Sequence, residues 1–439
     1  MNSRRRRDEA AREAPREAPR DAYVWIWLPG ATEPVVAGRM ARDGARLIFN
    51  YGRSSLSRPD AIAVYQPELP LERGAIVPQA GLTMAGCLRD AAPDAWGRRV
   101  ILNRTLGLKG KDTDIGLLDE LTYLLESGSD RIGALDFQTS PTDYIPRAAR
   151  TATLEDLLNA AGMVEKGVPL TPELDRALFH GSSVGGARPK AMIEDGDRKL
   201  IAKFSSSNDT HNIVKAEFVA MRLAARTGLD VAPVRLARAA GKDVLLVERF
   251  DRVRDAAGWQ RKAMVSALTL FGLDEMMARY ASYEDLAEIV RHRFTQPKAT
   301  LRELFGRLTF NILCGNTDDH ARNHAAFWDG RHLTLTPAYD ICPQSRTGNE
   351  ASQAMLIAGA NRMSRLANCI EAAPGFLLDA GAAESLIADQ IDALRSAWPD
   401  VVQEAELDEV GRTLLAGRAF LNPSIFEGAP RRLREMPRL

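Results

Sequence analysis

The most informative segment of the sequence is Gly315-Asn316-Thr317-Asp318-Asp319-His320-Ala321-Arg322-Asn323, and Ala338-Tyr339-Asp340 follows downstream. An Asp, four intervening residues, an Asn and a later Asp after an apolar run is the order of a kinase catalytic loop and metal loop. Phosphoryl transfer needs one carboxylate to orient the incoming hydroxyl and oxygen ligands to bind magnesium. Asp318 fits the first role, and Asn323 and Asp340 fit the second.

The loop motif alone is a weak signal, because Asp and Asn are common loop and cap residues. Upstream lies a glycine-rich segment, Gly181–Lys190, with three glycines, two serines and two cations. Glycines let the backbone approach an anion closely, and successive N–H groups can surround phosphate oxygens. The segment does not read as a P-loop, which disfavours that class of NTPase. Taken alone, the segment favours a simple surface hairpin over a phosphate-binding loop.

Charged residues follow this loop in an order that fits a kinase N-lobe. Lys203 ends an apolar strand candidate, and Glu217 lies beside the apolar stripe of a predicted helix over 213–226. A Lys–Glu pair between strand and helix positions nucleotide phosphates in kinases, although an exposed Lys and a solvated Glu are the alternative. Glu248 and Phe250 end the next strand candidate, where a hinge would meet adenine; a surface Glu and a core Phe are the alternative.

Composition restricts the class of protein. The 439 residues carry 58 acidic and 58 basic side chains, so the formal net charge is zero. A zero net charge argues against a protein whose whole surface binds nucleic acid. No apolar run is long enough to span a membrane, and the N-terminus lacks the apolar region of a signal peptide. Four scattered cysteines without a C-x-x-C pair are typical of free thiols in a reducing compartment. We therefore expect a cytoplasmic protein.

The pattern along the chain predicts an α+β fold with four segments. Residues 1–20 are an arginine-rich tail that we expect to be disordered. Residues 21–145 form a small β-rich N-terminal domain, with strand candidates at 24–28, 35–37, 47–49 and 61–65 and helix candidates at 91–100 and 113–126. Residues 146–255 form the β-rich kinase N-lobe, which opens on a capping-box-like Thr153-Leu154-Glu155-Asp156. Residues 256–439 form a helical C-lobe interrupted only by 323–343.

Together and in this order, the motifs resemble the HipA family of serine/threonine kinase toxins. The resemblance rests on Ser183-Val184-Gly185-Gly186-Ala187-Arg188-Pro189-Lys190, on Val247 to Arg252, on the stretch from Asn316 to Asn323, and on Leu335 to Ile341. The segments Leu88 to Arg99 and Asp130 to Leu135 are also similar to the small domain that precedes the kinase core in this family. The resemblance implies a bilobal protein-kinase-like fold behind a β-rich N-terminal domain.

The resemblance further implies the roles of individual residues. Asp318 becomes the catalytic aspartate, and Asn323 and Asp340 become the Mg²⁺ ligands. The residues that it implies for ATP binding are Lys203 at the phosphates, Glu248 and Phe250 at the hinge, His320 near the nucleotide, and Ser183, Val184, Gly185 and Gly186 in the glycine loop.

Two further features concern regulation and departures from the family pattern. Ser183 matches the loop serine that is autophosphorylated in this family, which ejects the loop and inactivates the kinase. Arg322 stands where Lys is familiar, and its forked guanidinium differs in geometry from an ammonium group.

The resemblance also implies partners. The family's usual partner is a helix-turn-helix antitoxin, HipB-like, which binds operator DNA, and its substrates include aminoacyl-tRNA synthetases. Two alternatives remain open at this level: a small-molecule phosphotransferase that shares D-x-x-x-x-N, and a catalytically silent scaffold for antitoxin and DNA.

Overall fold

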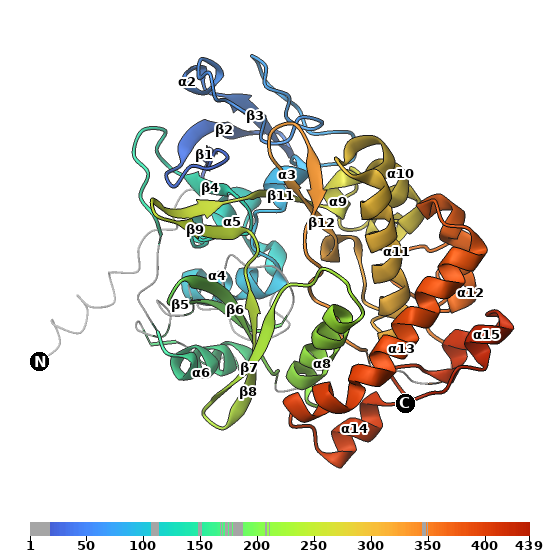
Figure 1. Cartoon of the computed structure of the whole chain (residues 1–439). Coiled ribbons are helices and arrows are strands. Elements are labelled where there is room, and N and C mark those ends of the chain that lie inside the picture. The colour runs from blue at the N-terminus through green and yellow to red at the C-terminus, as the bar shows by residue number, and fades with distance from the viewer. Residues whose placement is uncertain are drawn as a thin grey trace, which may run out of the picture.

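The computed structural model describes residues 18–106, 114–147, 152–166, 168, 170–171, 174, 178, 188–206, 209, 211–344, 348 and 350–439. The described chain comprises a β-rich N-terminal part, a lobe built on a second sheet, and a lobe of helices (Figure 1). The α+β, bilobal fold predicted from the sequence is therefore confirmed. Residues 1–17 of the expected tail lie outside the described residues.

The N-terminal part is built on an antiparallel sheet whose strands lie in the order β3-β2-β1-β4. These strands are β1 (Asp21–Ile26), β2 (Val35–Asp43), β3 (Arg46–Tyr51) and β4 (Leu135–Gln138). The strand expected at 61–65 is wrong, because this segment is an irregular connection in which Tyr65 bridges to Leu69. Pro59 and Pro67 flank it and have no N–H to donate to a strand ladder. The fourth strand, β4, comes from far along the chain instead.

Short helices follow this sheet. They are α2 (Arg53–Leu56), α3 (Gly86–Arg89), α4 (Ala95–Leu106), η1 (Ile115–Leu117) and α5 (Glu120–Glu126). The helix expected at 91–100 thus begins four residues later than predicted, at Ala95. The helix expected at 113–126 is divided, because the Asp119 side chain accepts from the N–H groups of Leu121 and Thr122 and starts α5 there.

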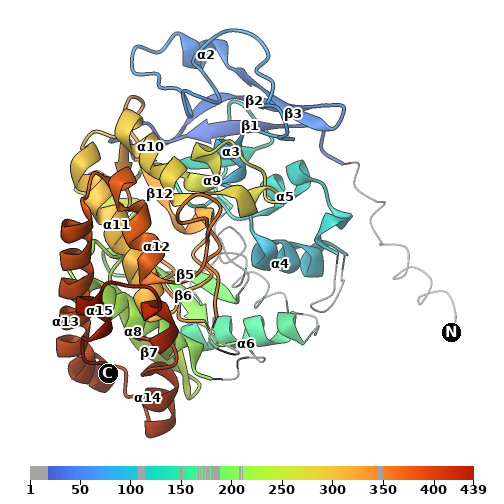
Figure 2. The ribbon, with the colours of Figure 1, turned by 90° about the vertical axis from the view of Figure 1, so that its right-hand side faces the viewer.

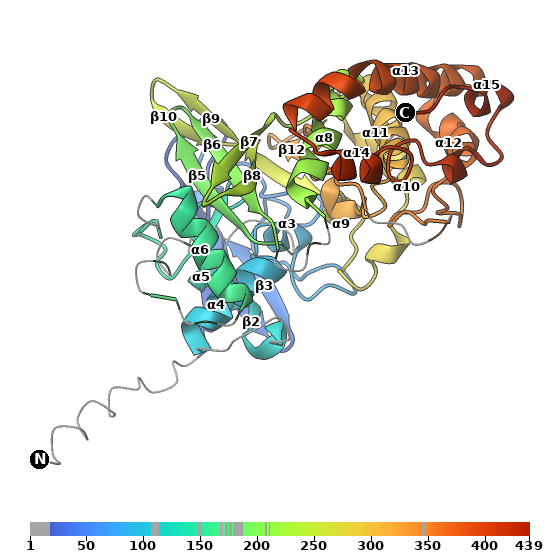
Figure 3. The ribbon, with the colours of Figure 1, turned by 90° about the horizontal axis from the view of Figure 1, so that it is seen from below.

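The second sheet forms the β-rich lobe, with antiparallel strands in the order β5-β6-β8-β7. They are β5 (Lys190–Asp195), β6 (Arg198–Phe204), β7 (Val234–Ala239) and β8 (Lys242–Glu248). Helices α6 (Leu154–Glu165) and α8 (Ile213–Arg226) lie on opposite sides of the sheet (Figure 3). The predicted capping box of Thr153 and Asp156 and the predicted bounds of α8 are confirmed.

A hairpin and a small sheet connect the two lobes. The hairpin pairs β9 (Arg252–Asp255) with β10 (Gly258–Arg261), and the sheet has the order β11-β12-β13. Its strands are β11 (Ala263–Ser266), β12 (Ala325–Trp328) and β13 (Leu333–Leu335). The expectation that only 323–343 interrupts the helices after residue 256 is therefore wrong. Strand β11 also lies in this region, close to its start, and pairs with β12.

The remaining elements form the helical lobe. They are α9 (Ala267–Leu270), η3 (Ala278–Tyr280), α10 (Tyr283–Arg293), α11 (Pro297–Cys314), η4 (Ala321–Asn323), α12 (Leu366–Ala372), η5 (Ala373–Phe376), α13 (Ala380–Glu404), α14 (Glu409–Leu415), η6 (Pro423–Phe426) and α15 (Arg431–Arg434). The long helix α13 lies beside α8 of the sheet-based lobe (Figure 1), where Arg222 Nε donates to Glu404 at 2.9 Å. No helix in the described ranges is long and apolar enough to cross a membrane.

The N-terminal part is joined to the connection between the lobes by a buried ionic network. The Asp130 carboxylate accepts from Arg249 at 3.0 Å and from Arg252 at 2.8 Å, and both guanidinium groups are almost fully buried. The Gly133 N–H donates to Asp251 at 2.8 Å. The blue and cyan N-terminal segments accordingly lie against both lobes (Figure 2).

Candidate active site

Lys203 is the centre of the candidate site. The extended backbone of β6 brings it to the face that α8 covers, and its Nζ lies 2.5 Å from Glu217 Oε1 of that helix. The same Nζ is paired with the Asp340 carboxylate from the helical lobe. Strand β6, helix α8 and the segment with Asp340 thus meet at the ammonium group of Lys203. The Lys203–Glu217 pair suggested by the sequence is present.

The electrostatics of these three groups are coupled. Lys203 lowers the pKa of Asp340 to about 2, so this carboxylate is ionised near neutral pH. Burial acts to lower the pKa of Lys203, but the adjacent carboxylates of Asp340 and Glu217 raise it well above its usual value. The site therefore keeps a permanent positive charge between two carboxylates, of which Asp340 is the more exposed.

The loop that carries Asp318 begins where α11 ends. Gly315 adopts a left-handed conformation with a φ of +73°, and a Cβ there would lie 2.9 Å from the carbonyl oxygen of Ala419. Glycine is therefore required both by the backbone and by the close approach of a neighbouring segment. The turn sends the chain directly into Asn316, whose Nδ2 donates to Asn311 Oδ1 at 3.0 Å.

Asp318 itself lies at the exposed side of this loop. Its carbonyl oxygen accepts from the His320 N–H at 2.9 Å and from Asn323 Nδ2 at 3.3 Å, which closes the loop on itself. Partial burial raises the pKa of the Asp318 carboxyl, as do the charges of Asp340 and Asp319, while His320 acts in the opposite direction. A raised pKa is a common property of carboxylates that orient or accept a proton.

A buried cluster that sequence reasoning missed supports the loop from behind. Asp319 accepts a hydrogen bond from Tyr283 Oη, and its Oδ1 lies 3.0 Å from His324 Nε2. Tyr283 and His324 are also in edge contact, with ring centroids 5.4 Å apart. The cluster fixes both ends of the segment between Asp318 and Asn323. The alternation of exposed Asp318 and buried Asp319 could not be read from two adjacent aspartates.

The segment that carries Asp340 contacts the loop that carries Asp318 and the ring of Phe250. Asp340 has a φ of +59°, a strained value for a non-glycine residue. The preceding Tyr339 donates its hydroxyl to the Arg322 carbonyl at 2.6 Å. Its ring lies 5.6 Å from the Phe250 ring, which also meets Phe327 at 5.9 Å. Phe250 is thus part of an aromatic cluster at the cleft.

A cavity of about 780 Å³ lies between the two lobes and the N-terminal part. Residues predicted for the site line much of it: Lys203, Glu248, Phe250, His320, Asn323 and Asp340. The N-terminal part contributes the wall from Arg89 to Arg98, which the sequence did not indicate. Asp318 is not among the lining residues. The glycine-loop residues Ser183, Val184, Gly185 and Gly186 lie outside the described residues.

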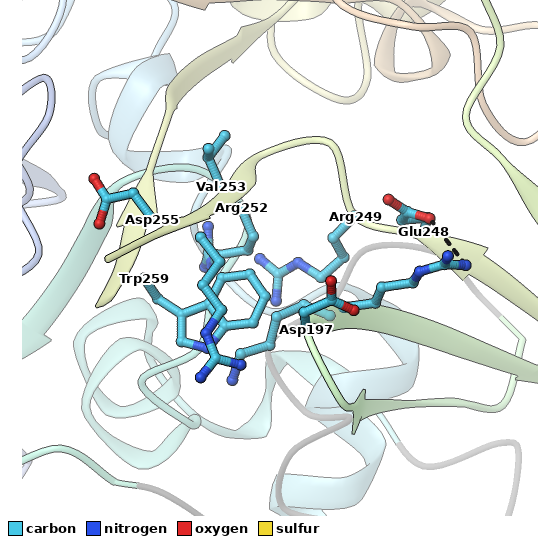
Figure 4. A pocket seen from close by; sticks show the side chains of 10 residues that line it. Asp197, Glu248, Arg249, Arg252, Val253, Asp255 and Trp259 are labelled. Carbon is cyan, nitrogen blue, oxygen red and sulfur yellow. Dashed lines mark ion pairs between the residues drawn. The ribbon is translucent and has the colours of Figure 1, made fainter. Parts of the chain in front are cut away.

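Glu248 also lines a second, outer pocket of about 440 Å³, which is shown in Figure 4. Its carboxylate lies 3.9 Å from Arg198 there. Trp259 forms the opposite side and contacts the cations of Lys199 and Arg254. The Glu248 side chain therefore has a partner outside the cleft. Its backbone N–H donates to the Pro233 carbonyl at 2.9 Å, so its carbonyl oxygen is the group that could meet a base at the hinge.

Two side chains provide oxygen atoms suited to magnesium. Asp340 is ionised, and Asn323 donates through Nδ2, which leaves its Oδ1 as an acceptor. In the described ranges, no cluster of three or more His, Cys, Asp or Glu residues is placed to hold a metal ion. An amide and a carboxylate beside a lysine instead fit an ion that takes its other ligands from phosphate and water.

This fold and this site define a protein with kinase-like architecture. Residues 27–138 match the HipA N-terminal domain, and residues 182–398 match the HipA-like C-terminal domain. The chain belongs to the HipA family.

Relatives and a solved structure agree with this assignment. Y4mE of Sinorhizobium fredii, whose name proposes a kinase, is 31% identical over 266 residues, which are 56% of this chain and 60% of that protein. The serine/threonine-protein kinase toxin HipA of Shewanella oneidensis is 26% identical over 184 residues, 36% of this chain and 42% of that protein. The matches thus span less than two thirds of either relative.

The fold is similar to Shewanella oneidensis HipA, solved with HipB and its operator DNA, with a TM-score of 0.69 and 19% identity over 94% of this chain and 100% of that chain.

Proposed function

We propose that this protein is an ATP- and Mg²⁺-dependent serine/threonine protein kinase that acts as the toxin of a toxin–antitoxin system. The observation that carries the proposal is Lys203, held between Glu217 of α8 and Asp340 beside the Asp318 loop. Kinases require this lysine, its glutamate and the metal-binding aspartate to be assembled before transfer. Membership of the HipA family supports the toxin role.

Each residue then has a defined task. Asp318 orients the acceptor hydroxyl and accepts its proton, for which its raised pKa is suited. Lys203 would bind phosphate oxygens. Asn323 and Asp340 would hold magnesium, which would supply positive charge next to the transferred group. Phe250, with Tyr339 beside it, covers the base at the hinge, and His320 lines the same cavity.

The proposal includes regulation and partners. We assign autophosphorylation to Ser183, where a phosphate would add close to two negative charges near the nucleotide phosphates and expel the glycine loop. A HipB-like helix-turn-helix antitoxin is the proposed partner, because the similar Shewanella oneidensis HipA was solved with HipB and operator DNA. The proposed substrate class is a translation protein such as an aminoacyl-tRNA synthetase, and the proposed location is the cytoplasm.

The test uses purified wild-type chain and Asp318→Ala with radiolabelled ATP and magnesium. Wild type should transfer label to itself, and peptide mapping with intact-mass measurement should place one phosphate on Ser183. Asp318→Ala should lose at least about 100-fold in rate while it melts like wild type, because the side chain is exposed and does chemistry. Wild-type transfer by Asp318→Ala would refute the assignment of this loop. Induction of each form in bacteria should arrest growth only for wild type.

A further inference from the structure

Three apolar side chains are exposed on the segment that connects α9 to α10. Met276, Met277 and Tyr280 have 85%, 43% and 50% of their surface exposed. Single exposed apolar side chains are normal on a protein, but a group of them often marks an interaction site. We call these three side chains the Met–Tyr patch.

The patch is distinct from the side chains that anchor the same segment in the fold. Phe271, Leu273 and Ala278 pack against the main hydrophobic core. The segment thus has an inward apolar set and an outward apolar set. Packing of the core accounts for the first set and leaves the Met–Tyr patch unexplained.

The backbone of the segment is fixed from two directions. Arg89 of the N-terminal part donates from Nη1 to the Leu273 carbonyl at 2.9 Å. Arg362 donates from Nη2 to the Arg279 carbonyl at 2.6 Å. A backbone that is held in this way presents its side chains at a reduced entropic cost of binding.

One end of the segment borders the candidate active site. Glu275 Oε1 lies 2.5 Å from Nη2 of Arg322, which belongs to the loop that carries Asp318. The next residue, Met276, lines the 780 Å³ cavity. The Met–Tyr patch therefore begins at the cavity that we propose for the nucleotide.

A second connection leads from the patch to the same loop. Arg362 also donates from Nη1 to the Ala354 carbonyl at 3.1 Å, and the Ala354 N–H donates to the Thr317 carbonyl at 3.0 Å. Thr317 directly precedes Asp318. The patch thus has a defined position relative to the proposed catalytic carboxylate.

The segment also carries one positive charge that is not neutralised. Glu275 has an arginine partner, and Asp274 accepts from the Met277 N–H at 2.8 Å. The exposed Arg279 guanidinium has no carboxylate partner in the described part of the chain, and its Nη2 donates to Tyr280 Oη at 3.1 Å. A partner that covers the patch would therefore complement Arg279 with a carboxylate.

Met, Tyr and Arg are residue types that are enriched in protein–protein interfaces. We infer that the Met–Tyr patch and Arg279 bind a segment of the protein substrate that has an apolar side chain near a carboxylate, and so position the acceptor hydroxyl toward Asp318. Methionine side chains adapt to partners of different shape, so the patch should select a class of side chain rather than one sequence. The inference rests on the proposed function and deepens it, because it states the chemistry of the substrate.

The experiment measures phosphorylation of an arrayed peptide library with radiolabelled ATP and magnesium. Each peptide has a central Ser, and one flanking position at a time is set to each residue type. Wild type should favour an apolar side chain at one or more positions by about 10-fold, the effect of one buried apolar group. It should favour Asp or Glu at a nearby position by about threefold, as expected for an exposed ion pair.

Two variants separate the two components of this selection. Arg279→Glu should reverse the charge preference, so that Lys or Arg peptides are favoured over Asp or Glu peptides. The double variant Met277→Ser, Tyr280→Ser should reduce the apolar preference to less than about twofold. Val410→Ser is the matched control, because Val410 is an exposed apolar residue of α14 that does not line the cavity.

Thermal melting and ATP affinity, measured by calorimetry, report whether each variant is intact. Both should stay unchanged, because the substituted side chains do not line the cavity. A reversed charge preference in a variant that binds ATP normally is a result that a purely structural role of Arg279 would not produce.

Self-labelling of the wild-type chain is measured in parallel and tests the proposed function separately. If wild type labels itself but labels no peptide, or shows no apolar or acidic preference, the inference is overturned while the kinase function stands. Retention of the acidic preference by Arg279→Glu also overturns it. If this variant only changes the self-association of the chain in light scattering, the patch is a contact between copies and the inference is wrong. If wild type labels neither itself nor any peptide, the proposed function falls together with the inference.

Discussion

Asp318 and Asp319 are neighbours in the chain with opposite surroundings. Asp318 is exposed, whereas Asp319 is 2% exposed and bonded to Tyr283 and His324. A carboxylate that must meet an incoming hydroxyl needs access, and a carboxylate that supports a loop needs partners. The spacing of the loop residues indicated Asp318 as the catalytic candidate. That Asp319 is the buried one of the two depends on its hydrogen bond with Tyr283, which is distant in sequence.

The raised pKa of Asp318 predicts a pH dependence of transfer. Because the ionised carboxylate is the active form, activity should fall as the pH drops through the pKa of Asp318, which lies above the usual 3.8. The low pKa of Asp340, about 2, keeps this proposed metal ligand ionised throughout this range. The measurement is the single-turnover rate with saturating ATP and magnesium between pH 4 and 8, at a constant ionic strength. A rate that remains flat down to pH 4 would contradict this role of Asp318.

At the scale of elements, the end of α11 determines where the loop that carries Asp318 starts. Gly315→Ala should destabilise the protein by about 2–4 kcal/mol, because it combines a left-handed backbone with a close approach to a carbonyl oxygen. The matched control is Gly228, just after α8, with a φ of +86° and no atom within 4 Å of the position that a Cβ would take. Gly228→Ala should cost only about 1 kcal/mol, the backbone component alone. Urea unfolding of both variants measures the difference, and equal costs would show that the Ala419 contact is unimportant.

Elements with strong local signals were predictable, and those defined by distant pairing were not. Helix α8 has the predicted bounds because an apolar stripe and the Asn212 cap act locally. Strand β4 was missed because its place in the sheet depends on β1, more than a hundred residues earlier. The same limit applies to the site: motifs supplied Lys203, while the apposition of Asp94 and Lys190 depends on how separate parts pack.

At the scale of the whole molecule, the N-terminal part connects to both lobes. The Asp90 carboxylate accepts from the N–H and hydroxyl of Ser266, each at 2.7 Å, at the start of α9. Asp94 reaches Lys190 in the β-rich lobe. Asp90 and Asp94 lie four residues apart in one segment of the N-terminal part. This segment therefore contacts both the helical lobe and the β-rich lobe. Any change of the angle between the lobes must therefore strain or break one of these contacts.

Asp130 provides the test of this attachment. Two nearly buried guanidinium groups share the carboxylates of Asp130 and Asp251. Asp130→Asn removes one of these two negative charges, and it should cost about 3–5 kcal/mol, as breaking a buried ion pair does. Burial acts to raise the pKa of Asp130, but Arg249 and Arg252 lower it well below 3.8. A lowered folded-state pKa contributes stability above the unfolded value and loses it as the pH falls through the folded value. The difference in unfolding free energy between wild type and Asp130→Asn should thus be full at pH 7 and narrow only in acid, below the usual carboxyl range.

Urea midpoints across pH measure this difference. The control is Asp60→Asn, which removes an exposed partner of Arg58 and should leave the urea midpoint unchanged. A gap that is small at pH 7 would mean that the N-terminal part is held to the lobes by its apolar contacts, and that the ionic network contributes orientation without stability.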